Sequence, residues 1–149
     1  KLLDHLQDGD FACAVGLEEN AVILAEAVAN SEPGTAGKIY GNLSSAYVQL
    51  RRYDKALMLS TRQLEIWEHM DYLPAQHSVL KSQIDGYKDF DGRDLTYLLQ
   101  DACVRKDWKG AIALKDRITM YMQDPSADRG WTCEIANNLG LVYLQLNQL

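Results

Sequence analysis

Proline is scarce in this chain, and its few positions already narrow the fold class. Only three prolines occur among 149 residues. Pro33 and Pro125 lie between segments of helical periodicity, while Pro74 suits a first helical turn, where its missing N–H is not needed. The alternation of Val, Ile and Thr that marks strands does not continue over any long segment, whereas apolar residues recur repeatedly at helical spacing. The sequence therefore predicts an all-α protein.

The sequence also has few cysteines and lacks long apolar runs. Three cysteines, an odd number at wide spacing, argue against a disulfide framework and favour a reducing compartment. We expect Cys13, Cys103 and Cys133 each to pack as a small apolar residue. No apolar run approaches the roughly 18 residues that span a bilayer, and no basic segment followed by an apolar stretch marks a secretory leader. These features favour a cytoplasmic protein.

Positive charge does not dominate anywhere in the sequence. The net charge is −6, and this mild acidic excess disfavours duplex nucleic acid and anionic membranes as partners. The sequence contains no glycine loop of the phosphate-binding type, no nucleophile motif and no acid–base pair at a recognisable spacing. We therefore expect no enzyme activity, no cofactor, and a protein or peptide as partner.

Apolar residues at helical spacing mark out the expected helices, and polar or glycine-containing pairs mark the turns. Gly9-Asp10 and Arg51-Arg52 are expected to be turns, 31–34 a loop, and Thr35 the N-cap of the helix after it. Asp107 is expected to cap another helix. The expected helical segments are 1–8, 11–30, 35–50, 53–67, 95–102, 108–118 and 132–146.

One segment carries a recognisable repeat pattern. It reads Tyr40-x-x-Leu43-Ser44-x-x-Tyr47, with Ala56 nine residues later, and a second copy begins at Leu139-Gly140-x-x-Tyr143. The pattern resembles the tetratricopeptide repeat, whose signature is W-x₂-L-G-x₂-Y followed by A-x₃-F and P. The resemblance implies a solenoid of antiparallel helix hairpins, in which Leu43, Tyr47 and Ala56 are buried where two helices cross.

The spacing of the residues that open each second helix gives the repeat period. Phe11 and Tyr53 are 42 residues apart, Trp108 and Leu149 are 41 apart, and Tyr53 and Trp108 are 55 apart. The period is similar to that of the longer tetratricopeptide variety in Pins-type adaptors, kinesin light chains and rapsyn-like scaffolds. The 55-residue spacing exceeds the 42-residue period, and we assign the excess to residues 71–92, as an extra helix or one over-long broken helix. The expected divisions are a partial repeat at 1–31, a repeat at 35–70, the insertion at 71–92, a degenerate repeat at 93–124 and the start of another at 131–149.

The resemblance implies that partners bind the concave wall formed by the first helix of each repeat. Asn42 and Asn138 stand where relatives use an Asn to bond a peptide backbone, because an amide both donates and accepts. Tyr97 takes that place in the third repeat and would supply stacking or apolar contact instead. An Asn is equally tolerated on an exposed helix face without any binding role. The remaining expected binding residues are Lys38, Ser45, Gln49, Arg93, Gln100, Asn137 and Gln145.

Three more specific site chemistries are only partly represented in the sequence. Lys38, Asn42 and Arg93 form only a fragment of the family's carboxylate clamp, and Tyr97 interrupts it. The acidic run Asp89–Asp94 is incomplete as a calcium loop, since carboxylates are missing at both required ends. It predicts an acidic loop between helices, with Asp94 as an N-cap. The histidines, at positions 5, 69 and 77, are too dispersed for a zinc site on one helix, and no metal site is expected.

The leading hypothesis is a scaffold or adaptor that captures a peptide segment of another protein. The alternatives are an architectural segment packed permanently in a larger assembly, and a regulatory module that senses a peptide. Polar, Asn-lined walls would favour capture, and exposed Leu and aromatic patches would favour assembly. The last helix lacks a covering partner in the sequence, so we expect a longer array or a partner there. The side chains expected to be uncovered are Leu139, Val142, Leu144 and Leu146.

Overall fold

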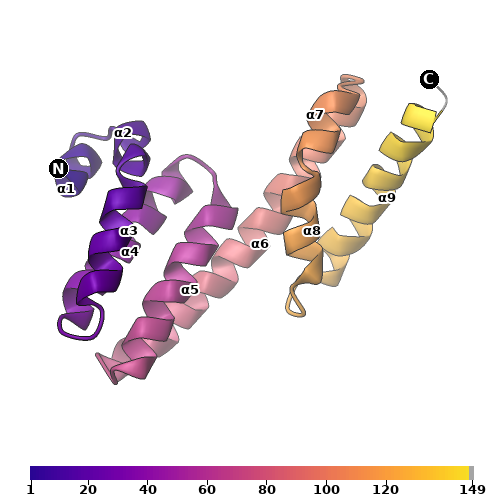
Figure 1. Ribbon diagram of the computed structural model, residues 1–149. Coiled ribbons are helices and arrows are strands. Elements are labelled where there is room, and N and C mark those ends of the chain that lie inside the picture. Colours follow the sequence, from indigo (N-terminus) through magenta and orange to yellow (C-terminus); the bar gives the residue numbers. More distant parts are fainter. Residues whose placement is uncertain (148–149) are drawn as a thin grey trace. The chain divides into compact units, whose positions relative to one another are not determined.

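A computed structural model describes residues 1–147, and within that range all regular structure is helical (Figure 1). The prediction of an all-α chain is confirmed. Residue Leu149, on which the 41-residue spacing depends, lies outside the described range. The helices are α1 (Leu2–Gln7), α2 (Phe11–Gly16), α3 (Glu18–Val28), α4 (Pro33–Gln49), α5 (Tyr53–His69), α6 (Pro74–Val104), α7 (Trp108–Ala113), α8 (Lys115–Gln123) and α9 (Arg129–Asn147).

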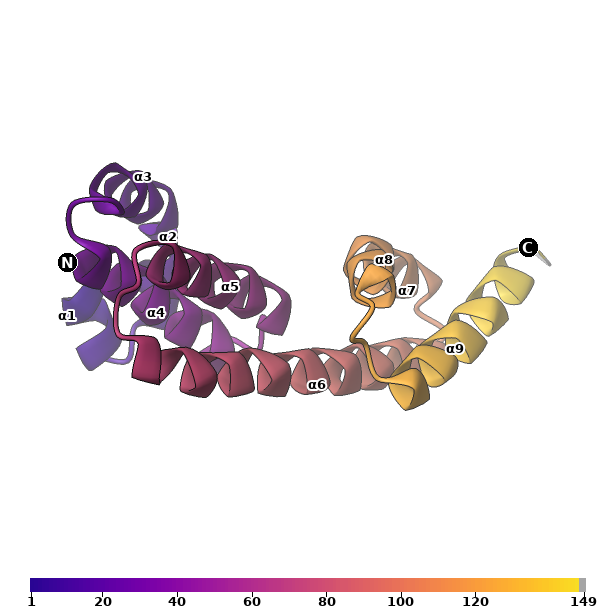
Figure 2. The same cartoon turned by 90° about the horizontal axis from the view of Figure 1, so that it is seen from below.

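The chain divides into two compact units, and the long helix α6 contributes to both. The first unit runs from Lys1 to Tyr87 and the second begins at Lys88. In the first unit, α3 and α5 form one layer, and α4 and the beginning of α6 form the other (Figures 1 and 2). In the second unit, α7 and α8 form one layer, and the end of α6 and α9 form the other (Figure 2). Each unit is therefore built from two layers of helices around its own core.

The core of the first unit contains the residues that the repeat pattern placed there. Leu43 and Ala56 are fully buried and Tyr47 is buried, so this expectation is confirmed. The seam between α4 and α5 also carries a polar pair, in which the Ser44 and Ser60 hydroxyls lie 2.7 Å apart. The Ser44 hydroxyl also lies 3.1 Å from the Ala56 carbonyl oxygen, to which it can donate. These two buried hydroxyls are thus hydrogen-bonded, as burial of a polar group in a core favours.

One helix–turn–helix geometry, in which the second helix begins directly after the turn, occurs three times within residues 1–147; α5 ends in the same kind of turn at Asp71, but α6 begins only two residues after Tyr72. In each copy a residue with positive φ follows the first helix: Gly9 at 73°, Arg51 at 56° and Lys106 at 57°. The N–H of the next residue then donates to the carbonyl five residues earlier, which satisfies the end of the first helix as in a Schellman motif. These bonds run from Asp10 to His5, from Arg52 to Tyr47 and from Asp107 to Ala102, at 2.8, 2.9 and 2.9 Å.

The second helix of each copy opens in the same way. An aromatic residue comes first and a fully buried alanine follows three positions later, in the pairs Phe11 and Ala14, Tyr53 and Ala56, and Trp108 and Ala111. An alanine at this place lets two helix axes approach closely, because helices pack at about 8–10 Å. The repetition is therefore present in backbone geometry as well as in sequence.

Two of the expected second helices are broken, and this corrects the sequence-based boundaries. The segment 11–30 was expected to be one helix, but α2 ends at Gly16 and α3 begins at Glu18. The Leu17 N–H donates to the Ala14 carbonyl three residues earlier, which tightens the turn locally. Leu114 does the same with Ala111 between α7 and α8. Each break comes six residues after the opening aromatic residue.

Helix α4 begins two residues earlier than expected. Pro33 is its first residue and Glu32 its N-cap, so the assignment of Thr35 as N-cap is wrong. A proline is favoured at this position because the first turn leaves its N–H groups unpaired anyway. The Thr35 hydroxyl instead donates to the Glu32 carboxylate at 3.0 Å. Part of the expected loop 31–34 is therefore helical.

Helix α6 replaces the expected insertion and loop with one continuous helix of 31 residues. It begins at Pro74, as predicted, but it is not broken, and the expected loop at Asp89–Asp94 and N-cap at Asp94 are wrong. Asp91 and Asp94 are buried on this helix and face Arg117 of α8. The Arg117 guanidinium lies 2.8 Å from Asp91 and 3.7 Å from Asp94. This charge pairing keeps the acidic segment helical and buried.

The core of the second unit covers more of the last helix than expected. Leu139, Val142, Leu144 and Leu146 were expected to be uncovered. Val142 is fully buried, so this expectation is wrong for Val142, and Leu139 and Leu146 are partly buried. Leu144 is 58% exposed, as expected. Among the described helices, none combines the length and hydropathy needed to cross a membrane.

Candidate functional site

The four expected binding residues of the first unit share one face of α4. Lys38, Asn42, Ser45 and Gln49 are separated by four, three and four positions, which is the spacing of one helical stripe. Lys38, Ser45 and Gln49 are exposed and Asn42 is half-buried. The Ser45 hydroxyl donates to the Gly41 carbonyl at 2.9 Å, so it is occupied within the helix. Within residues 1–147 the Asn42 side chain makes no hydrogen bond and leaves its amide available.

The opposite face of α4 is tied to α3 by two tyrosine–glutamate hydrogen bonds. The Tyr40 hydroxyl donates to Glu26, and the Tyr47 hydroxyl donates to Glu18. Burial, reinforced by these carboxylates, raises the pKa of each tyrosine to about 12. Both tyrosines therefore stay protonated and keep donating at neutral pH. The bonds fix the rotation of α4 and so the direction of its polar stripe.

Glu26 also binds Arg62 of α5, which joins three helices of the first unit. The guanidinium makes two hydrogen bonds to the carboxylate, both at 2.8 Å. The hydrogen bonds from Arg62 and then from Tyr40 lower the pKa of Glu26 to about 2. Two parallel bonds to one carboxylate are the favoured geometry for arginine. None of these partners carries a sequence signal, because they lie 14 and 36 residues from Glu26.

The expected binding residues on α6 also share a face, but one of them is already engaged. Arg93, Tyr97 and Gln100 are exposed, and Tyr97 is 60% exposed. The Arg93 guanidinium lies 3.3 Å from Asp89, and its centre lies 5.8 Å from the Phe90 ring and 6.0 Å from the Trp131 ring. Cation–π contacts of this length are favourable. Arg93 therefore belongs to an aromatic cluster of its own unit, and Tyr97 is the freer of the two.

The expected binding residues of α9 lie among exposed apolar side chains. Asn137 and Gln145 are exposed, and Asn138 is half-buried with its backbone carbonyl 4.0 Å from the Cys103 sulfur. Leu141, Tyr143 and Leu144 are exposed on the same helix. The α9 surface is consequently more apolar than the polar stripe of α4.

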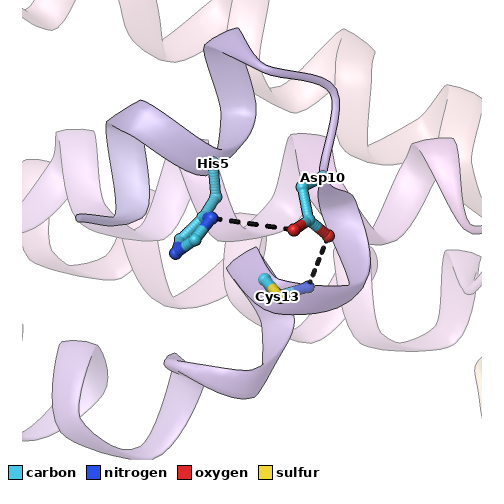
Figure 3. Close-up of side chains that lie close together, drawn as sticks. All are labelled: His5, Asp10 and Cys13. Atoms are coloured by element: carbon cyan, nitrogen blue, oxygen red, sulfur yellow. Dashed lines mark hydrogen bonds and ion pairs between the residues drawn. The ribbon is translucent and has the colours of Figure 1, made fainter.

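A cluster that the sequence patterns did not single out lies at the first turn. His5, Asp10 and Cys13 each offer one metal-ligating atom, and these atoms all lie within 4.8 Å of one another (Figure 3). His5 Nδ1 is 3.8 Å from Asp10 Oδ2, and the Cys13 N–H donates to Asp10 Oδ1 at 3.1 Å. Hydrogen bonds from Cys13 lower the pKa of the Asp10 carboxyl, and this carboxylate raises the pKa of the Cys13 thiol.

The three residues flank a turn, so a pattern of zinc ligands on a single helix does not include them. The spacing His-x₄-Asp-x₂-Cys across Gly9 is the signal that could have found the cluster. The expectation that every cysteine packs as a small apolar residue is wrong for Cys13 and Cys133, which are exposed, while Cys103 is half-buried.

No protein-family model, curated protein or solved structure matches this chain. The helix arrangement and the surfaces described above are therefore the basis for any assignment of function.

Proposed function

We propose that this protein is a non-enzymatic interaction module of the tetratricopeptide kind, which captures a peptide segment of a partner protein. The observation that carries the proposal is the polar stripe of α4, made of Lys38, Asn42, Ser45 and Gln49, on a helix whose other face is buried. The threefold recurrence of one helix–turn–helix geometry supports a repeat architecture. Repeat proteins use such extended helix surfaces for binding.

The stripe has the chemistry that an extended peptide needs. The amide of Asn42 can accept from a peptide N–H and donate to a peptide carbonyl at the same time. Lys38 lies one helical turn before it and supplies a positive charge for an acidic side chain or a carboxylate. Gln49 lies near the end of α4 and adds a second amide. These groups bond the backbone of a partner and so tolerate many peptide sequences.

A displayed library of random peptides, selected on the full chain, tests the proposal and supplies the peptide ligand in the same step. The selected peptide is then added to ¹⁵N-labelled protein, and the changes of backbone amide shifts are mapped. We expect the largest changes on α4, around Lys38, Asn42 and Gln49. Changes confined to α3 and α5, in the other layer of the unit, would contradict the proposal.

A second candidate function is an architectural segment of a larger assembly. It is favoured by the exposed Leu141 and Leu144, which lie three positions apart on one face of α9, because neighbouring exposed apolar residues mark protein contacts. In that case a variant carrying Leu141→Glu and Leu144→Glu should lose association with the assembly while α4 variants retain it. If peptide capture is the function, α4 variants should lose partner binding and the Leu141→Glu, Leu144→Glu variant should retain it.

A further inference from the structure

The first turn of the chain brings three different metal-ligating side chains to one point. His5 comes from the end of α1, Asp10 from the connection and Cys13 from the first turn of α2 (Figure 3). All three are at least partly open to solvent, so an ion can reach them. A nitrogen, an oxygen and a sulfur donor therefore lie within 4.8 Å of one another.

The backbone holds these side chains in place before any ion is present. The Asp10 N–H donates to the His5 carbonyl at 2.8 Å, which fixes the end of α1 against the connection. The Cys13 N–H donates to Asp10 Oδ1 at 3.1 Å, which fixes the start of α2. Gly9 makes the tight reversal possible at a φ of 73°. Short local bonds thus set the mutual positions of the ligands.

The other copies of the same turn show what the turn itself requires. Asp107 caps α7 as Asp10 caps α2, with its carboxylate 2.9 Å from the Gly110 nitrogen. At that turn Ala102 and Gly110 take the places of His5 and Cys13. Capping therefore accounts for the aspartate alone, and the imidazole and thiol are not needed to form the turn.

The donor set points to a borderline divalent metal. Zinc binds imidazole nitrogen, thiolate sulfur and carboxylate oxygen, whereas calcium and magnesium take oxygen ligands. In a tetrahedral zinc site two ligands at about 2.0–2.2 Å from the ion lie roughly 3.3–3.6 Å apart. The 3.8 Å between His5 Nδ1 and Asp10 Oδ2 needs only a small adjustment to reach this.

We propose that His5, Asp10 and Cys13 form a zinc-class metal site with three protein ligands and one open position. Asp10 ligates through Oδ2 and keeps Oδ1 as the acceptor for the Cys13 N–H. The Cys13 thiol releases its proton to solvent when its sulfur binds the ion, because the thiolate is the ligand. The fourth position is taken by water.

Titration of the tag-free, reduced full chain with Co²⁺ tests the site, because cobalt replaces zinc and its absorption reports the ligands. We expect one bound Co²⁺ per chain, with a sulfur-to-cobalt charge-transfer band and with displacement by Zn²⁺. Cys13→Ser should abolish that band, and His5→Ala should weaken binding by about tenfold or more. Zn²⁺ should also raise the unfolding temperature of the wild type and not that of Cys13→Ser.

Matched variants separate a metal site from unspecific thiol binding. Cys133→Ser removes the other exposed cysteine and should leave the spectrum unchanged. Asp107→Asn makes the same change as Asp10→Asn at a cap of the same geometry, and asparagine can still cap the helix, but only Asp10→Asn should weaken cobalt binding. The proposal is overturned if the wild type binds no stoichiometric Co²⁺, or if the charge-transfer band survives in Cys13→Ser and disappears in Cys133→Ser. Circular dichroism of each variant confirms that the helices are intact.

Discussion

At the scale of single residues, two glycines inside helices have opposite surroundings. A Cβ on Gly37 of α4 would overlap the indole of Trp67 on α5, whereas a Cβ on Gly86 of α6 would meet no atom within 4 Å. The Trp67 ring is also fixed by a hydrogen bond from its Nε1 to the Pro33 carbonyl at 3.2 Å. The close approach of α4 and α5 therefore depends on the missing side chain at position 37.

We predict that Gly37→Ala destabilises the protein by about 1–3 kcal/mol, as overpacking of a tight contact does. Gly86→Ala is the matched control and should stabilise by about 0.5–1 kcal/mol, because alanine is the better helix former. Chemical denaturation measures both. Equal effects of the two substitutions would show that the Trp67 contact does not restrict position 37.

The ion pair of Glu26 makes the first unit sensitive to acid. The pKa of Glu26 is about 2 in the folded protein, below its ordinary value of 4.5. A lowered pKa means that this group stabilises the fold above pH 4.5 and that the contribution is lost as the pH falls towards 2. The Glu26 side chain is 40% exposed, so solvent screening limits the contribution to about 1 kcal/mol.

The corresponding measurement compares the wild type with Glu26→Gln. The difference in unfolding free energy should be constant above pH 5 and should shrink as the pH falls from about 4.5 to 2. Glu19→Gln, an exposed change on the same helix, should show little difference at any pH. A Glu26→Gln difference that stays constant down to pH 2 would contradict the assignment.

At the scale of the helices, α6 depends on buried charge pairing. Asp91 and Asp94 of α6 face Arg117 of α8, and all three side chains are largely buried. We predict that Arg117→Met costs about 3–5 kcal/mol, because it leaves buried carboxylates without their cation. Arg105→Met is the control, since Arg105 forms an exposed pair with Asp101 on one helix and should change stability by less than about 1 kcal/mol. Similar urea midpoints for the two variants would contradict this account.

Helix α6 shows which features could be predicted from sequence patterns and which could not. The motif around Leu43 and the apolar residues at helical spacing predict the helix pairs and buried residues such as Leu43, Tyr47 and Ala56, because the periodicity of apolar residues indicates which face of a helix packs. The acidic run at residues 89–94 predicts a loop wrongly, since its partner Arg117 lies 26 residues from Asp91. The breaks at Leu17 and Leu114 and the cluster at His5 likewise depend on contacts around turns that a one-helix pattern does not contain.

At the scale of the whole molecule, the two units differ in the surfaces that they offer. The first unit presents the polar stripe of α4, and the second presents exposed apolar residues on α9 and the exposed Tyr97 of α6. The positions of the stripe residues could be predicted from the repeat resemblance. The engagement of Arg93 by Phe90 and Trp131 could not, because it depends on packing between α6 and α9.

We propose that the α4 stripe serves binding and not folding, and the Asn42→Ala variant separates these two roles. The unfolding free energy and the affinity for the selected peptide are measured on the same variant, with Asn20→Ala on α3 as the matched control. We predict that Asn42→Ala changes stability by less than about 0.5 kcal/mol and weakens affinity by about 1 kcal/mol or more, roughly fivefold. Asn20→Ala should change neither quantity. A large loss of stability in Asn42→Ala with unchanged peptide affinity would contradict the claim and favour the architectural role.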